Sequence, residues 1–154
     1  MSISPFPTPI AELSAEQYRL LAEFRRRIRE FLHFSEEAAR QQGIEPQQHQ
    51  LLLAIQGLAP NEKPTVSVLA ARLCIKHHSA VELINRLAER GAVVRRNSEK
   101  DRREVLVELT EKGRTILRSL SVLHWHQLQD SGAELARALE TIIEQSASEL
   151  RSHS

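Results

Sequence analysis

Residues 65–110 read TVSVLAARLCIKHHSAVELINRLAERGAVVRRNSEKDRREVLVELT, and this stretch decides the fold. Its first half holds two short patterns with the i, i+3, i+4 spacing of one buried helical face. The apolar positions of the first pattern are Val66, Leu69, Ala70 and Leu73. Those of the second are Ala80, Leu83, Ile84 and Leu87. Thr65 suits the N-cap of the first helix, and Gly91 suits the C′ position after the second. The sequence therefore predicts a pair of helices joined by a tight corner.

A β-hairpin is predicted directly after this helix pair. Residues 93–96 have the composition of a short strand, residues 97–101 that of a polar turn, and residues 102–109 that of the returning strand. The returning strand alternates with a period of two, as a half-buried strand does. Basic residues cluster at and near the turn: Arg95, Arg96, Lys100, Arg102 and Arg103. Arginines on a protruding hairpin suit phosphate contacts and insertion into the minor groove of DNA.

The charge of the chain is unevenly distributed. The 154 residues contain 21 Lys and Arg against 20 Asp and Glu, so the whole chain is nearly neutral. Residues 72–103 alone hold nine basic and four acidic residues, a local net charge of +5, which leaves −4 for the remainder. Positive charge is thus concentrated on the segment predicted to meet a polyanion. A solvated basic hairpin without a partner is the alternative explanation.

The second helix directs a mainly polar face away from its buried side. This face comprises His77, His78, Ser79, Val81, Glu82 and Asn85. A second helix that presents its N-terminal residues outward fits recognition of the major groove. The same face is equally compatible with an ordinary solvated helix when it is considered alone.

The run LAARL…VELINRLAERGAVVRR…DRREVLVELTEKG resembles the MarR family of winged-helix transcriptional regulators. The strongest motif is Asp101-Arg102-Arg103, followed by the alternating strand, Thr110 and Gly113. Asn85-Arg86-Leu87 and Gly91 match the end of the family's recognition helix. The resemblance is sharp over residues 65–113 and extends in helix order over most of the chain. It implies a mainly α-helical fold with a two-stranded wing.

The resemblance also implies roles for individual residues. Arg103 or Arg102 would enter the minor groove, and Asp101 would hold the wing by pairing with an arginine, for which Arg86 is the natural candidate. The polar face of the second helix would meet the major groove. The chain departs from the family pattern at Val81 and Glu82. Glu82 could accept a hydrogen bond from a cytosine amino group, but we expect it to pair with Arg86 at i, i+4.

The remaining segments are predicted to form long helices. Prolines at alternate positions make residues 1–13 an expected extended arm, and residues 14–154 an expected single domain. Ser14 with Gln17 forms a capping-box signature, Pro46 fits a helix N1 position, and Thr110 fits an N-cap. Asp130-Ser131-Gly132 is predicted to interrupt the last segment, with Ser131 and Glu134 capping a separate final helix.

The domain organisation follows from these segments. We expect a DNA-binding lobe over about residues 46–110 and dimerisation helices over about residues 14–42 and 110–151. In the family the terminal helices form a homodimer, which would place two wings on a near-palindromic duplex. A monomer whose apolar stripes close its own core is the alternative.

Other classes of protein fit the sequence poorly. There is no apolar run near 18 residues and no signal-peptide pattern, and the single cysteine suits a reducing compartment, so we expect a cytoplasmic protein. We find no phosphate-binding glycine loop, no activated nucleophile and no carboxylate pair typical of an enzyme, and we expect no cofactor. The histidines lack the spacing of a zinc site, and Cys74 is expected to be a small buried residue.

A small-molecule effector is a further implication of the resemblance. His33, His49 and Trp125 lie on the helices expected to flank such a pocket, although His49 and Trp125 would more often be core or interface residues. The sequence thus favours a homodimeric regulator of transcription, more often a repressor in this family. The competing hypothesis is a winged helix that serves only as a protein-interaction module.

Overall fold

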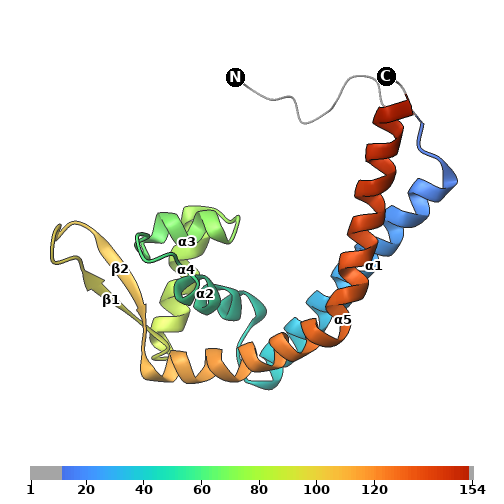
Figure 1. The fold of residues 1–154 in the computed structure, drawn as a ribbon. Helices are drawn as coiled ribbons and strands as arrows, with labels where there is room; N and C mark the ends of the chain where they lie inside the picture. The colour runs from blue at the N-terminus through green and yellow to red at the C-terminus, as the bar shows by residue number, and fades with distance from the viewer. Residues whose placement is uncertain (1–11, 153–154) are drawn as a thin grey trace. The chain divides into compact units, whose positions relative to one another are not determined.

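The computed structural model describes residues 12–152 and contains five helices and one two-stranded sheet within them (Figure 1). In chain order these elements are α1 (Ala15–Gln41), α2 (Pro46–Gln56), α3 (Val66–Arg72), α4 (His77–Glu89), β1 (Val93–Asn97), β2 (Val105–Leu109) and α5 (Glu111–Ser152). The predicted mainly helical fold with a β-wing is confirmed. The arm expected at residues 1–13 lies, but for its last two residues, outside the described part of the chain.

The chain divides into two compact units, and long helices α1 and α5 each contribute to both. One unit comprises residues 33–127 and therefore holds α2, α3, α4 and the sheet. The described residues of the other unit are 12–32 and 128–152. None of the helices in residues 12–152 has an apolar stretch that could span a membrane.

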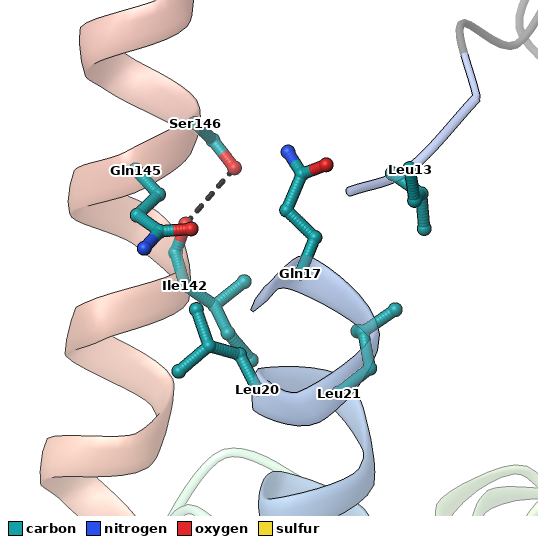
Figure 2. A pocket seen from close by; sticks show the side chains of 7 residues that line it. All are labelled: Leu13, Gln17, Leu20, Leu21, Ile142, Gln145 and Ser146. Carbon is teal, nitrogen blue, oxygen red and sulfur yellow. Dashed lines mark hydrogen bonds between the residues drawn. The ribbon is translucent and has the colours of Figure 1, made fainter. Parts of the chain in front are cut away.

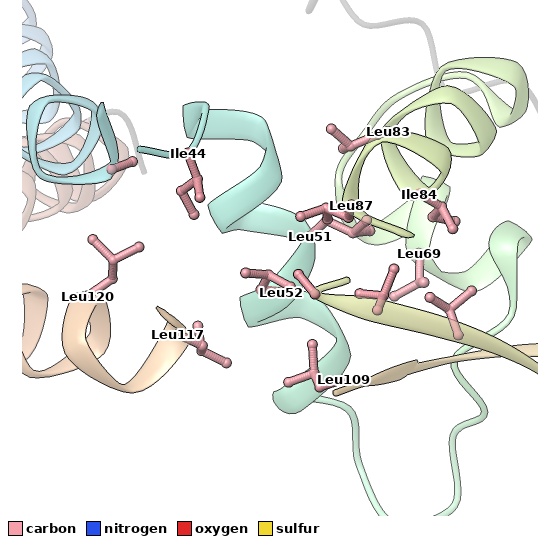
Figure 3. Packing of buried hydrophobic residues seen from close by; sticks show 14 of the residues in the cluster. Ile44, Leu51, Leu52, Leu69, Leu83, Ile84, Leu87, Leu109, Leu117 and Leu120 are labelled. Carbon is pink, nitrogen blue, oxygen red and sulfur yellow. The ribbon is translucent and has the colours of Figure 1, made fainter. Parts of the chain in front are cut away.

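The unit of residues 33–127 is built around one apolar core (Figure 3). Side chains from every helix of this unit and from both strands converge there. The largest fully buried apolar side chains are Leu51, Leu52, Leu69, Ile84, Leu87, Val93, Val107 and Leu120. All four residues predicted to be buried in α4 are buried. Burial of a leucine or isoleucine side chain contributes about 1.5–3 kcal/mol, so this core fixes α4 against α2 and the sheet.

Predicted caps hold the ends of the helices. Ser14 and Gln17 exchange backbone-to-side-chain hydrogen bonds of 2.8 and 3.2 Å at the start of α1. Thr65 accepts a bond from the Val68 amide at 3.3 Å, and Thr110 accepts one from the Gly113 amide at 3.1 Å. These side chains satisfy amides that have no partner inside their helices.

The corner between α3 and α4 differs from the expectation at Cys74. The amides of Cys74 and Ile75 donate to the carbonyls of Ala71 and Ala70, the Schellman pattern that ends a helix. This pattern requires a left-handed residue, and Cys74 adopts a φ of +53°. Its side chain is exposed rather than buried. The same pattern closes α4 with Gly91 at φ +70°, where glycine is the usual choice.

The wing, residues 93–109, is an antiparallel pair in which Val93 faces Leu109 and Asn97 faces Val105. The returning strand begins at Val105 rather than at residue 102, and Asn97 belongs to β1 rather than to the turn. A local turn takes the intervening residues, because the Glu104 amide donates to the Asp101 carbonyl at 3.0 Å. That bond occupies the Glu104 amide, and the regular pairing of the two strands begins at Val105.

Helix α5 is continuous from Glu111 to Ser152, so the predicted interruption at residues 130–132 is wrong. A single glycine costs a helix only about 1 kcal/mol relative to alanine, less than the loss of a turn of backbone hydrogen bonds and its packing. Glu134, expected to cap a new helix, instead forms an ion pair with Arg27 of α1.

The second unit consists of the start of α1 packed antiparallel on the end of α5. Leu20 and Ile142 point toward one another beside a cavity of about 160 Å³ (Figure 2). None of its residues 12–32 and 128–148 is fully buried. Its exposed large apolar side chains are Tyr18, Leu21, Leu32, Leu128, Leu139 and Ile143.

Candidate nucleic-acid interface

Helix α4 carries all six residues predicted to meet the major groove. Its buried face is locked into the core, which fixes the rotation of the helix and hence which side chains point outward. Ser79 and Val81 are half-buried. The exposed positions are His77, His78, Glu82, Asn85 and Arg86. The structure thus brings the six predicted positions and Arg86 onto the outer part of one helix.

A hydrogen bond connects this helix to the wing. Arg95 of β1 donates from Nη2 to the side-chain oxygen Oδ1 of Asn85 at 2.5 Å. The two residues lie ten positions apart, so the bond joins α4 to the strand that follows it. The predicted helix contacts and the first wing arginine therefore form one continuous polar surface.

The tip of the wing is organised by short-range hydrogen bonds. Asp101 accepts a bond from the Arg103 amide at 2.9 Å, and Asn97 donates from Nδ2 to the Arg102 carbonyl at 2.8 Å. These bonds hold the backbone of the turn and leave the side chains at the tip exposed. The exposed residues are Lys100, Asp101, Arg102 and Arg103. A hairpin with exposed arginines is suited to contact phosphates and the minor groove.

Arg96 is the exception among the wing arginines. Its Nε lies 2.9 Å from a carboxylate oxygen of Glu108 across the sheet. Both side chains are largely exposed, so the pair contributes little to stability. It does balance the charge of Arg96, which makes Arg96 a weaker phosphate ligand than Arg102 or Arg103.

Arg86 has neither of the partners predicted for it. It lies 3.6 Å from the carboxylate of Glu45, the residue before α2. Asp101 instead turns back on its own loop, and among residues 12–152 Glu82 has no ion pair. Long side chains on a solvated surface have several partners within reach, which sequence spacing alone does not rank.

The three residues predicted to flank an effector pocket are not brought together. His33 is exposed, and Trp125 is 67% exposed. His49 is 2% exposed and stacks on His124, with ring centroids 4.7 Å apart and an angle of 12° between the rings. Phe34 meets His124 edge-on at 5.9 Å.

The environment of His49 disfavours its protonation. Neither ring nitrogen has a hydrogen-bond partner within the described residues. Burial lowers the pKa of His49 to about 4, and repulsion from His124 adds to the effect. Burial also lowers the pKa of His124, against hydrogen bonds to the backbones of Leu120 and Ser35. We therefore expect a neutral, stacked histidine pair at pH 7.

Sequence reasoning missed two residues that position α4 and the wing. Arg90, just after α4, donates to the Gly43 carbonyl at 2.5 Å and to the Gln48 side chain at 3.2 Å. Lys63 lies 2.7 Å from Glu104, the last residue of the turn that joins the two strands of the wing. Neither has a local sequence signal beyond its charge. Within residues 12–152, no group of three or more histidine, cysteine or acidic side chains could hold a metal ion.

Comparisons with known proteins agree with this geometry. Residues 42–104 match the model of the MarR family. A Thauera aromatica protein named "Putative transcriptional regulatory protein for hcr operon" is 30% identical over 114 residues, which cover 74% of this chain and 67% of that protein. AbsC, a MarR family transcriptional regulator from Streptomyces coelicolor, has a similar structure with a TM-score of 0.71 and 20% identity, covering 93% of this chain and 99% of AbsC.

A MepR variant from S. aureus, determined bound to an oligodeoxyribonucleotide, is also similar. Its TM-score is 0.60 at 17% identity, and the match covers 92% of this chain and 99% of that one. The helix pair, the basic wing and these matches lead to one conclusion: the chain belongs to the MarR family of DNA-binding transcriptional regulators.

Proposed function

We propose that this chain is a homodimeric repressor that binds near-palindromic duplex DNA through α4 and the wing. The proposal divides residues 14–154 into a DNA-binding lobe of about residues 46–110 and dimerisation helices of about 14–42 and 110–151. The proposed DNA contacts are His77, His78, Ser79, Val81, Glu82, Asn85, Arg86, Arg95, Arg96, Lys100, Asp101, Arg102 and Arg103. The proposed partners are a second copy of the chain and an operator.

The observation that carries the DNA contacts is the bond between Arg95 and Asn85. It supports one continuous surface for DNA. On this surface, α4 supplies polar side chains that can contact base edges, and the wing supplies exposed arginines that can contact the DNA backbone. Phosphate contacts would provide most of the salt-sensitive affinity. Base-edge contacts from α4 would provide the choice of sequence.

The unit formed by the ends of α1 and α5 supports dimerisation. It contains no fully buried residue among residues 12–32 and 128–148, yet it exposes six large apolar side chains. Two helices cannot cover each other's apolar stripes, whereas two pairs can form a bundle. The area gained would stabilise a symmetric dimer, in which the same surface of each protomer contacts the other.

The proposed effector would act near His49. The support is chemical: both ring nitrogens of a nearly fully buried histidine lack partners among the described residues, and buried polar groups ordinarily have them. A small molecule with a hydrogen-bonding group could satisfy one of them. His33 and Trp125, the other two residues proposed for this site, are exposed.

Binding to the duplex upstream of the chain's own gene tests the proposal. Fluorescence anisotropy is measured against a scrambled duplex across a salt series, and the oligomeric state by light scattering. We expect a species of twice 17.5 kDa and sequence-preferring binding that weakens steeply with salt. A monomer that binds both duplexes weakly and equally would favour the protein-interaction module instead.

A further inference from the structure

We propose that two residues of α4 select bases by their hydrogen-bonding groups. Glu82 accepts hydrogen bonds and selects cytosine, whereas Asn85 donates them and selects a base with acceptors, such as guanine. This inference rests on the proposed function, because it assumes that α4 enters the major groove. It assigns the base chemistry of the half-site, which the family membership does not provide.

The first step is the freedom of the Glu82 carboxylate. On a helix, the side chains that can reach residue 82 lie three or four positions away, at His78, Ser79, Asn85 and Arg86. Arg86 is paired with Glu45 at 3.6 Å, and Asn85 is bonded to Arg95. Within residues 12–152, Glu82 has neither an ion pair nor a side-chain hydrogen bond, and it is exposed. Its acceptors are therefore available to a ligand.

The second step is the chemistry of the bases. An ionised carboxylate only accepts hydrogen bonds. In the major groove, guanine presents two acceptors and thymine presents an acceptor and a methyl group, so both repel a carboxylate. Adenine places its N7 acceptor beside its amino group, whereas cytosine presents the N4 amino donor without an adjoining acceptor. Cytosine is the base that matches Glu82.

The third step is the orientation of Asn85. A free asparagine favours adenine because its oxygen accepts from N6 while its nitrogen donates to N7. Here the Arg95 guanidinium donates to Oδ1 at 2.5 Å, which engages the acceptor and leaves Nδ2, with its two hydrogens, as the group that can donate to a base. An adenine amino group at Oδ1 would also lie beside the positive charge of Arg95. Asn85 thus acts as a donor, which suits the N7 and O6 acceptors of guanine.

Glu82 and Asn85 are close enough along α4 to contact bases that lie near one another in the duplex. Three residues of helix rise about 4.5 Å, close to the roughly 3.4 Å between successive base pairs. Glu82 and Asn85 would therefore contact the same or neighbouring base pairs. The half-site is expected to contain a G·C pair whose cytosine faces Glu82, with guanine as the preferred base opposite Asn85.

Selection from a randomised duplex library with the full-length protein tests this inference. The variants are Glu82→Gln, Arg95→Ala and, as a matched control, Arg96→Ala. Arg96 lies on the same strand and carries the same charge, but it pairs with Glu108 rather than with Asn85. Competition with single-base variants of the selected duplex then measures each preference.

The expected result is a change of base preference at particular positions. Replacing the cytosine should weaken wild-type binding about 5- to 150-fold, and Glu82→Gln should change the preferred base there to adenine. Arg95→Ala should allow adenine opposite Asn85. Arg96→Ala removes only a proposed contact to the DNA backbone, so it should weaken binding to all duplexes alike and keep the wild-type consensus. If Glu82→Gln strengthens binding to all duplexes equally and keeps the wild-type consensus, Glu82 acts only through its charge and the inference is overturned. If the wild-type protein selects no consensus, the proposed function itself fails.

Discussion

The buried histidine pair makes the stability of the lobe dependent on pH in a direction that the structure determines. His49 is neutral when folded, with a pKa of about 4, whereas an unfolded histidine has a pKa near 6.5. The unfolded chain therefore binds more protons between these two values. Stability is fully present above about pH 6.5 and decreases as the pH falls toward 4.

The magnitude follows from the difference between the two pKa values. One pKa unit corresponds to about 1.4 kcal/mol, so the full difference corresponds to at most about 3–4 kcal/mol. At pH 5 the linkage relation gives a loss of about 2 kcal/mol from His49 alone. Small domains are stable by only about 5–15 kcal/mol, so this loss is readily measured.

The perturbation is His49→Leu, which replaces a buried ring that has two unpartnered nitrogens with an apolar side chain of similar volume. Urea unfolding is measured for both proteins at pH 7, 6 and 5, and the comparison at each pH cancels the contributions of titrating groups that do not contact His49. We expect the variant to be at least as stable at pH 7, because no hydrogen bond within the described residues is lost. Its advantage should increase by about 2 kcal/mol at pH 5. A stability difference that stays constant across this range would refute the buried neutral pair.

Three other substitutions test separate parts of the structure. Gly113→Ala would place a Cβ 2.0 Å from the Ala92 carbonyl oxygen, so it should destabilise the protein by about 2–3 kcal/mol. Gly132→Ala would place a Cβ 3.9 Å from its nearest neighbour, so it should stabilise the helix by about 1 kcal/mol. Thermal unfolding measures both effects. Cys74→Gly should stabilise by about 1 kcal/mol in urea, because it removes a side chain from a left-handed position, and Cys74→Ala should not. Arg103→Ala should weaken binding to all duplexes and reduce the salt slope by about 2 per dimer, as measured by anisotropy; an unchanged slope would remove the wing tip from the interface.

Sequence predictions succeeded where the cause is local. The caps at Ser14, Thr65 and Thr110, and the glycine at the end of α4, depend on residues within a few positions of one another. The buried face of α4 could be predicted because its apolar residues recur with the period of a helix and mark the side that packs against the core. The fold class was therefore predictable, because helix boundaries and apolar faces together leave few arrangements.

The errors arise where a local signal competes with the rest of the structure. Ser131 and Gly132 carry a helix-start signature, but the continuous helix keeps its backbone hydrogen bonds and outweighs it. Cys74 was predicted to be buried from its residue type, but the corner requires a left-handed residue there and exposes its side chain. A local sequence signal indicates the conformation and burial that a residue favours, whereas contacts with the rest of the structure determine those that it adopts.

Contacts between distant residues had no sequence signal at all. Nothing in the spacing of His49 and His124 indicates that the rings stack, and nothing near Arg86 indicates that Glu45 is closer than Glu82. The candidate interface was predictable as a set of residues, because helix periodicity and the basic hairpin define it. Its internal hydrogen bonds, such as that between Arg95 and Asn85, required the three-dimensional arrangement.

Hydroxyl-radical footprinting of the full-length protein on its selected duplex tests the central claim most directly. A dimer that places α4 in the major groove and the wings beside it should protect two symmetric sets of sugars, with half-site centres about one helical turn apart. Arg103→Ala should remove protection only at the outer minor-groove positions. A single unsymmetrical footprint, or none at a protein concentration that saturates binding, would contradict the account.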